Sequence, residues 1–186
     1  MIARTLLVLL CAALPSIGAA DAIRHDYLDY RRVQLDDRLS QPRYAHEMEW
    51  HGALDGDLIY RLGLRSGPAT ERYSLAGGLK HDYTLSRSSY ALLGVRLDGE
   101  DLQANFDGGL RARMLGGAVE LNGAVSAQAS HGADDGVELS AGLHVFVAPG
   151  VALGVSLARA TGDVRTARLS LRFEQQSDAQ RRQRLP

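Results

Sequence analysis

The sequence predicts an all-β fold, a closed antiparallel up-and-down transmembrane β-barrel of about ten strands, with eight strands as the alternative. From residue 43 onward, apolar and polar side chains alternate with a period of two, which is the pattern of β-strands. Tight turns also alternate with longer polar segments, as in membrane barrels that have short turns on one side and longer loops on the other. Finally, glycine is abundant, with 20 of the 186 residues, which favours strands joined by tight turns.

The first 20 residues predict a cleaved secretory signal peptide. Residues 1–4 are short and positively charged, residues 6–14 form an apolar run, and residues 18–20 are small, as signal peptidase requires. The apolar run is too short for a membrane-spanning helix, which needs about 20 residues. The only cysteine, Cys11, lies in this segment behind bulky residues, which argues against a lipid anchor. We therefore expect export and a mature chain without thiol or disulfide chemistry.

The predicted strands are justified one by one by their alternation. A first strand, rich in tyrosine and charge, is expected at 26–35, and nine more at 44–54, 58–65, 72–80, 90–97, 105–114, 119–128, 137–145, 151–158 and 166–173. Residues 141–160 are apolar enough to suggest a helix, but Pro149 and Gly150 interrupt them and both halves alternate, so a hairpin is expected. One barrel domain is thus predicted over 21–173, followed by a disordered polar tail at 174–186.

The connections differ in length in a regular order. Residues 55–57, 116–117 and 149–150 predict tight turns, whereas 65–70, 97–102, 129–136 and 160–163 predict longer loops at the opposite end. Residues 84–89 are somewhat long for a position where a tight turn is expected. An even number of strands returns both termini to the same side of the membrane.

Alternation alone does not say which face is buried. The polar face combines small residues with arginine and glutamate, which suits a narrow polar lumen, and aromatic residues recur near strand ends as in interfacial girdles. We therefore expect the apolar face to contact outer-membrane lipid and the polar face to form a lumen network of paired charges. The residues predicted for this network are Arg43, Glu47, Glu49, His51, Arg61, Arg65, Arg72, Arg96, Arg111, Arg113, Glu120, Glu138, Arg168 and Arg172.

The layout resembles the small outer-membrane β-barrel families of Gram-negative bacteria. The resemblance is carried by the signal peptide, the short alternating strands and a last strand with Leu169, Leu171 and Phe173, and it implies that these three residues are an assembly signal for the barrel-assembly machinery. Arg168 stands where that signal usually has glycine, and Phe173 is not the last residue. The tyrosine-rich segment 26–30 and the stretch 144–149 also look like a family from plant-associated bacteria reported as secreted signal or immune-elicitor proteins.

No motif in the sequence points to a catalytic centre, a cofactor or a metal. Glu47, Glu49 and His51 share one strand face, about 7 Å apart in succession, but the arginine-rich strands beside them favour a salt network over acid–base chemistry. His81 and Asp82 are adjacent and therefore point to opposite faces. The net charge of −1 gives no reason to expect nucleic-acid binding.

We therefore predict a non-enzymatic outer-membrane barrel with a structural or interaction role, or a very narrow pore. Its extracellular or envelope partner is not indicated by the sequence. One alternative is an outer-membrane enzyme acting on lipid or peptide, which would gather acid–base residues at the outer rim. Another is a soluble periplasmic barrel that binds an apolar ligand, which requires an apolar interior.

Overall fold

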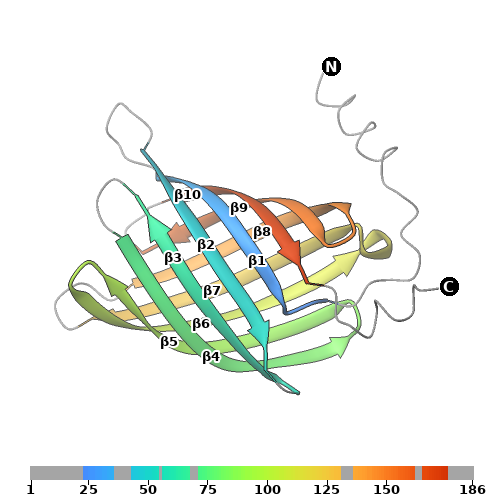
Figure 1. Ribbon diagram of the computed structural model, residues 1–186, viewed down its shortest axis with the longest axis horizontal. Helices are drawn as coiled ribbons and strands as arrows, with labels where there is room; N and C mark the ends of the chain where they lie inside the picture. Colours follow the sequence, from blue (N-terminus) through green and yellow to red (C-terminus); the bar gives the residue numbers. More distant parts are fainter. Residues whose placement is uncertain are drawn as a thin grey trace.

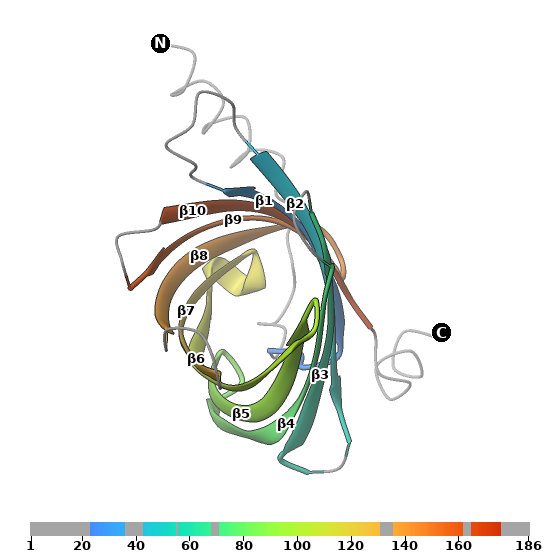
Figure 2. The same cartoon turned by 90° about the vertical axis from the view of Figure 1, so that its left-hand side faces the viewer.

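The computed structural model describes residues 23–35, 43–54, 56–67, 71–130, 136–161 and 165–175. Within these ranges, ten strands close into one barrel in the order β1-β10-β9-β8-β7-β6-β5-β4-β3-β2 (Figures 1 and 2). This confirms the predicted ten strands over the alternative of eight. The strands are β1 (Tyr27–Leu35), β2 (Arg43–Ala53), β3 (Leu58–Ser66), β4 (Glu71–Thr84), β5 (Arg87–Asp98), β6 (Asp101–Met114), β7 (Val119–Ser130), β8 (Gly136–Ala148), β9 (Val151–Ala160) and β10 (Arg165–Glu174).

The barrel closes because the first strand pairs with the last. β1 runs antiparallel to β10, with Tyr27 opposite Glu174 and Leu35 opposite Thr166 (Figure 1). All other pairs join neighbours in the sequence, which is the predicted up-and-down topology. A closed ring leaves no unpaired strand edge, a requirement for β-structure in lipid.

Four short connections lie at one end of the barrel, which we call the tight-turn end. They join β2 to β3, β4 to β5, β6 to β7 through a short 3₁₀ turn (Leu115–Gly117), and β8 to β9. The expectation of a longer connection over 84–89 was wrong, because β4 and β5 continue until only Leu85 and Ser86 remain between them.

The opposite end, which we call the loop end, carries the remaining connections. Here the expectation of a longer loop over 97–102 was wrong. Asp98 pairs with Asp101, and Gly99, at φ +63°, turns the chain within two residues. The other predicted loops lie largely outside the described residues, as do the predicted signal peptide and all of the predicted tail beyond 175. β10 includes Glu174, one residue beyond the predicted end of the barrel.

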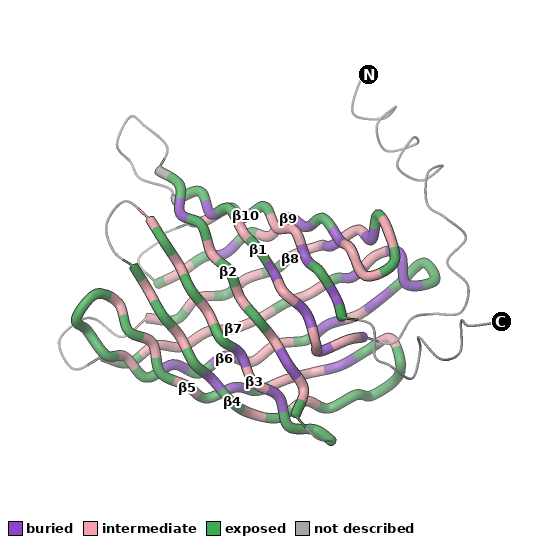
Figure 3. Tube along the Cα trace, in the orientation of Figure 1, coloured by how far each residue is buried: buried purple, intermediate pink, exposed green. Residues whose placement is uncertain are grey.

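Exposure alternates along the strands (Figure 3). Most large apolar side chains are exposed on the outer face, whereas most charged side chains of the strands are buried or half-buried in the interior. Leu93 is 70% exposed, whereas Asp29 and Glu120 have no exposed surface. This is the reverse of a soluble barrel, whose apolar face is turned inward. The interior also holds one small apolar cluster of Ile59, Ala76 and Leu92. Among the described residues, no helix is long and apolar enough to cross a membrane.

Candidate functional site in the barrel lumen

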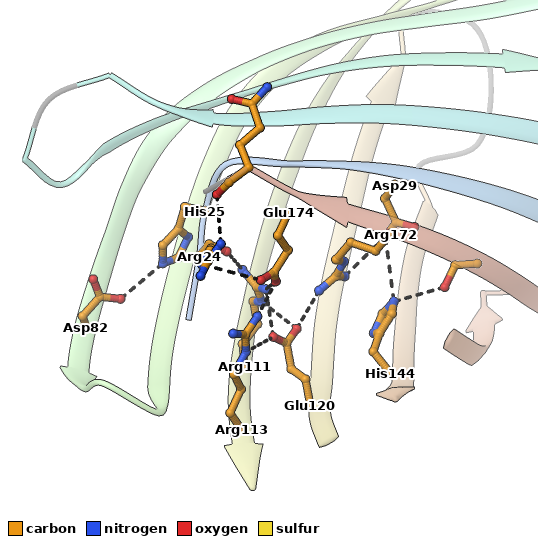
Figure 4. A network of polar contacts seen from close by, with 12 residues as sticks. Arg24, His25, Asp29, Asp82, Arg111, Arg113, Glu120, His144, Arg172 and Glu174 are labelled. Atoms are coloured by element: carbon orange, nitrogen blue, oxygen red, sulfur yellow. Dashed lines mark hydrogen bonds and ion pairs between the residues drawn. The ribbon is translucent and has the colours of Figure 1, made fainter. Parts of the chain in front are cut away.

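A cluster of buried charges fills the interior near the tight-turn end (Figure 4). We call it the Glu120 cluster, and its members are Asp29, Arg111, Arg113, Glu120, Arg172 and Glu174. Asp29 lies on β1, the arginines on β6 and β10, Glu120 on β7 and Glu174 at the end of β10. The cluster therefore joins the closing seam of the barrel to the strands facing it.

Glu120 is the centre of this cluster because three guanidinium groups donate to its carboxylate. Arg111 donates from Nε and Nη2, each at 2.9 Å, to the two oxygens. Arg113 donates from Nε at 3.0 Å and Arg172 from Nη1 at 2.7 Å. Glu120 and Arg113 are directly paired across β6 and β7, and Arg111 follows two residues along the same inward face. Local strand register thus brings Arg111 and Arg113 to Glu120, whereas Arg172 reaches it across the lumen from β10.

Two further acids complete the cluster. Asp29 accepts a hydrogen bond from Arg172 Nη2 at 3.3 Å across the β1–β10 seam. Glu174 pairs with Arg113 and lies 3.8 Å from Arg111. The guanidinium groups of Arg172 and Arg111 also lie over the Tyr27 ring, 4.3 Å and 5.0 Å from its centroid. A buried charge is costly without partners, and every charged member of the cluster has one.

The segment 23–26, which precedes β1, lies across the tight-turn end of the barrel. Its first residue, Ile23, is buried and donates a backbone hydrogen bond at 2.8 Å to Leu85 in the β4–β5 turn, beyond β2 and β3. The carbonyl of Arg24 accepts a hydrogen bond from Arg111 Nη1 at 2.7 Å, which ties the segment to the Glu120 cluster. The segment and the cluster therefore occupy this end of the lumen together.

His25 anchors the same segment to β4. Its Nε2 lies 3.2 Å from Asp82 Oδ1 (Figure 4). Asp82 also accepts a hydrogen bond from Lys80 Nζ at 2.5 Å. Burial and the positive charge of Arg111 lower the pKa of His25 from 6.5 to about 4, although Asp82 acts in the opposite direction. His25 is therefore neutral at neutral pH in the folded barrel.

A second group of charges lies in the middle of the lumen. Arg61 on β3 pairs with Asp107 on β6, and Asn105 Nδ2 also donates to Asp107 at 2.7 Å. On the β1–β2 side, Glu49 lies 2.9 Å from Arg31 and 3.3 Å from His51. These contacts join strands across the interior as well as neighbours in the sheet.

The charges nearest the loop end form separate pairs. Arg65 pairs with Glu47 at 3.2 Å, Arg168 donates to Glu138 at 2.7 Å, and Arg72 pairs with Asp98. Arg96 differs, because it forms no ion pair with any described residue. Its Nε and Nη1 atoms are buried, and no described acceptor lies within hydrogen-bonding distance of them.

An interior cavity of about 150 Å³ runs past these groups. Eight arginines and four carboxylates line it, together with small polar residues. A smaller recess of about 40 Å³ beside it is lined by Arg65, Arg72, Arg96 and Ser74, among others. The walls of the lumen are therefore polar and carry more positive than negative groups.

The structure places all the predicted network residues whose side chains it describes on the inward face. The side chain of Arg43 lies outside the described residues. Arg31 lies 3.1 Å from Asp29 and 2.9 Å from Glu49, so it links the Glu120 cluster to Glu49 and His51 in one network. The ion pair of Arg61 with Asp107 and the loop-end pairs are formed between other lumen residues. Of the predicted assembly signal, Leu169 and Phe173 are exposed on the outer face and Leu171 is partly exposed.

Several lumen residues were missed by the sequence reasoning. Asp29 and Arg31 follow the period-two pattern of the first strand, and that signal could have found them. Glu174 sits where the apolar pattern ends, and Arg24 and His25 lie in a non-periodic segment, so no pattern distinguished them.

One contact has the residue types of a hydrolase triad but not its geometry. His144 Nε2 lies 3.1 Å from Ser170 Oγ, and Asp29 Oδ2 lies 3.9 Å from the same Nε2 atom. In a triad the acid holds the other nitrogen, Nδ1, whereas Nδ1 of His144 is buried without a hydrogen-bond partner. Within the described ranges, no group of three or more potential ligands is arranged to hold a metal ion.

The closed barrel of ten antiparallel strands and its apolar outer face define the fold class, a β-barrel of the outer-membrane type. No family model matches the chain, and no curated protein matches it. Among solved structures it is similar to the KdgM porin, with a TM-score of 0.57 and 6% identity over 81% of this chain and 99% of that one. The KdgM porin in complex with disordered oligogalacturonate gives the same TM-score and coverage at 11% identity. The NanC porin gives 0.53 and 11% identity over 80% of this chain and 100% of that one. The likeness to secreted signal or immune-elicitor proteins stays a prediction.

Proposed function

We propose that the chain is a small, non-enzymatic barrel of the bacterial outer membrane, with a lumen that is closed to bulk solutes at its tight-turn end. It would be exported with a cleaved signal peptide and assembled through its last strand. On this proposal the barrel serves as an envelope-structural or ligand-binding protein.

The observation that carries the proposal is the filling of the tight-turn end. Glu120, Asp29 and Arg172 are at most 2% exposed. Ile23 and His25 are also buried, and they flank Arg24, whose carbonyl accepts a hydrogen bond from Arg111. A conducting path would have to pass through these paired charges, and breaking a buried ion pair costs about 3–5 kcal/mol. Opening this end therefore requires a rearrangement of the cluster or of the segment 23–26.

A narrow pore is the second candidate, because the fold is shared with porins. Single-channel recording in planar bilayers separates the two. We expect the folded wild-type barrel to give no stable conductance steps, and a variant without residues 23–26 to give steps or a raised leak. Steady steps from the wild type, with none added by the deletion, would contradict the closed end.

Folding and location are checked on the same preparations. We expect the protein in the outer-membrane fraction and a shift in its gel mobility between unboiled and boiled samples. A soluble periplasmic protein without a shift would refute the membrane assignment. A fluorophosphonate probe tests the contact of His144 with Ser170, and labelling lost in Ser170→Ala would contradict the non-enzymatic assignment.

A further inference from the structure

Arg96 is a charged group in the lumen whose hydrogen-bonding needs are not met by the protein. It lies on the inward face of β5, between Ser74 on β4 and Gln103 on β6. Two of its three guanidinium nitrogens, Nε and Nη1, are buried and lack an acceptor. A buried guanidinium without an acceptor is unfavourable, and such a group in a native fold calls for a water or an ion.

The nearby carboxylates are already engaged by other arginines. Glu47 pairs with Arg65 at 3.2 Å, and Glu49 with Arg31 at 2.9 Å. Asp98, two residues after Arg96 on the same face of β5, pairs with Arg72. Withdrawing any of these acids to satisfy Arg96 would leave another buried arginine unpaired. The carboxylates near Arg96 are therefore all engaged. The Oε1 atom of Gln103, opposite Arg96, is buried without a partner, but it is neutral and cannot balance the charge of the guanidinium.

The surroundings of Arg96 favour an anion over water alone. Arg65 and Arg72 line the same 40 Å³ recess together with Glu47 and Glu49, so three guanidinium groups and two carboxylates border it. Both carboxylates are paired with other arginines, which leaves the charge of Arg96 unbalanced there. Gln103 lies opposite Arg96, and Ser74 contributes a hydroxyl to the recess. Arginine binds planar carboxylates through two parallel hydrogen bonds. The hydroxyl of Ser74 and the side-chain amide of Gln103 can donate to the same carboxylate.

From this arrangement we infer that Arg96 is the anchor of a binding site for a small organic carboxylate, held in the lumen toward the loop end. The carboxylate lies in the recess with Arg65 and Arg72, and the rest of the molecule extends into the adjoining cavity. The cavity volume of about 150 Å³ limits the ligand to a small molecule rather than a polymer. The inference deepens the proposed function, since it names the ligand class of a barrel that is closed at its other end.

The test is binding of ¹³C-labelled acetate to the folded barrel in detergent, followed by NMR line broadening at constant ionic strength. We expect saturable binding to the wild type, at least tenfold weaker in Arg96→Gln and partly retained in Arg96→Lys, which keeps the charge but loses the planar fork. Arg87→Gln is the matched control, because Arg87 lies on the same strand but is exposed on the outer face. It should bind acetate like the wild type.

Three outcomes would overturn the inference. The first is that acetate does not bind saturably to the wild type. The second is that the Arg96 and Arg87 variants lose acetate affinity equally. The third is that chloride displaces acetate at equal concentration, which would indicate a general anion site. The gel-mobility shift verifies that each variant is folded. If the wild type conducts in bilayers but acetate still binds through Arg96, the closed-end proposal fails and the carboxylate site stands. If it does not conduct and acetate does not bind, the reverse holds.

Discussion

Replacing Glu120 by glutamine removes the charge that holds three buried arginines and nearly preserves the shape of the side chain. Arg113 keeps Glu174 as a partner, and Arg172 keeps Asp29 at 3.3 Å. Arg111 keeps its 2.7 Å hydrogen bond to the Arg24 carbonyl, but a neutral amide replaces the carboxylate that accepted two hydrogen bonds, and Glu174 lies 3.8 Å away. The variant therefore leaves about one buried guanidinium uncompensated.

Leaving one partner of a buried ion pair uncompensated costs about 3–5 kcal/mol. With a urea dependence of about 2 kcal/mol/M, this loss lowers the unfolding midpoint by about 1.5–2.5 M. Trp50, the only tryptophan, is 47% exposed on the outer face, so its fluorescence reports loss of the apolar surroundings. The measurement is equilibrium unfolding in detergent or lipid, with the gel-mobility shift as a second probe.

Glu138→Gln is the matched control, because the side chain of Glu138 is 25% exposed and its ion pair joins it to Arg168 alone. A partly solvated pair contributes about 0–1 kcal/mol, so the midpoint should move little. Equal, small shifts in both variants would refute the reasoning that the Glu120 cluster is desolvated and stabilises the barrel.

Three other perturbations test separate parts of the structure. The pKa of His25 is lowered to about 4, so its contribution to the free energy of unfolding is complete above pH 6.5 and is lost as the pH falls from 6.5 toward 4. His25→Gln should therefore reduce the loss of stability over this pH range in equilibrium unfolding. Parallel stability profiles for the two proteins would argue against this role. Leu93→Arg, at a site 70% exposed on the outer wall, should cost about 2–4 kcal/mol in lipid vesicles if it faces the hydrocarbon, whereas Leu102→Arg near the loop end should cost about 0–1 kcal/mol; equal costs would contradict a lipid-facing belt. Gly154→Ala places a methyl group against an imidazole and a hydroxyl in the lumen and should lower the unfolding midpoint, whereas Gly123→Ala meets only an ordinary contact at 3.9 Å and should be nearly neutral.

The sequence was sufficient for the faces of the strands because each residue step reverses the side-chain direction. Arg111 and Arg113 on β6 were expected to point inward and are buried there. The predicted strand boundaries were wrong at strand ends, where polar residues continue the hydrogen-bonded pairing of the strands. Asp98 and Asp101 read as loop residues but pair across β5 and β6.

Partners across the lumen were not predictable in the same way. Alternation says that a side chain points inward but not which distant strand it meets, since that depends on the stagger and closure of the whole barrel. Arg61 and Asp107 are 46 positions apart, and Arg172 and Asp29 are 143 apart. The segment before β1 was missed for another reason, because its contacts through His25 depend on its crossing of the barrel end.

The Glu120 cluster includes two charges at the closing seam of the barrel, Asp29 and Arg172, which favour the correct register of β1 and β10 more strongly than apolar side chains would. A shift of one residue between paired strands turns every inward side chain outward. Across the β1–β10 seam such a shift would turn Asp29 or Arg172 toward lipid, where an arginine costs about 2–4 kcal/mol at the midplane and about 0–1 kcal/mol near the interfaces. Apolar residues in the lumen would carry no such penalty, because they are tolerated on both faces. The buried pairs therefore penalise incorrect closure in addition to any net stability they contribute, and a seam variant with apolar replacements at both positions should fold into a more heterogeneous set of barrels even where its average stability is unchanged.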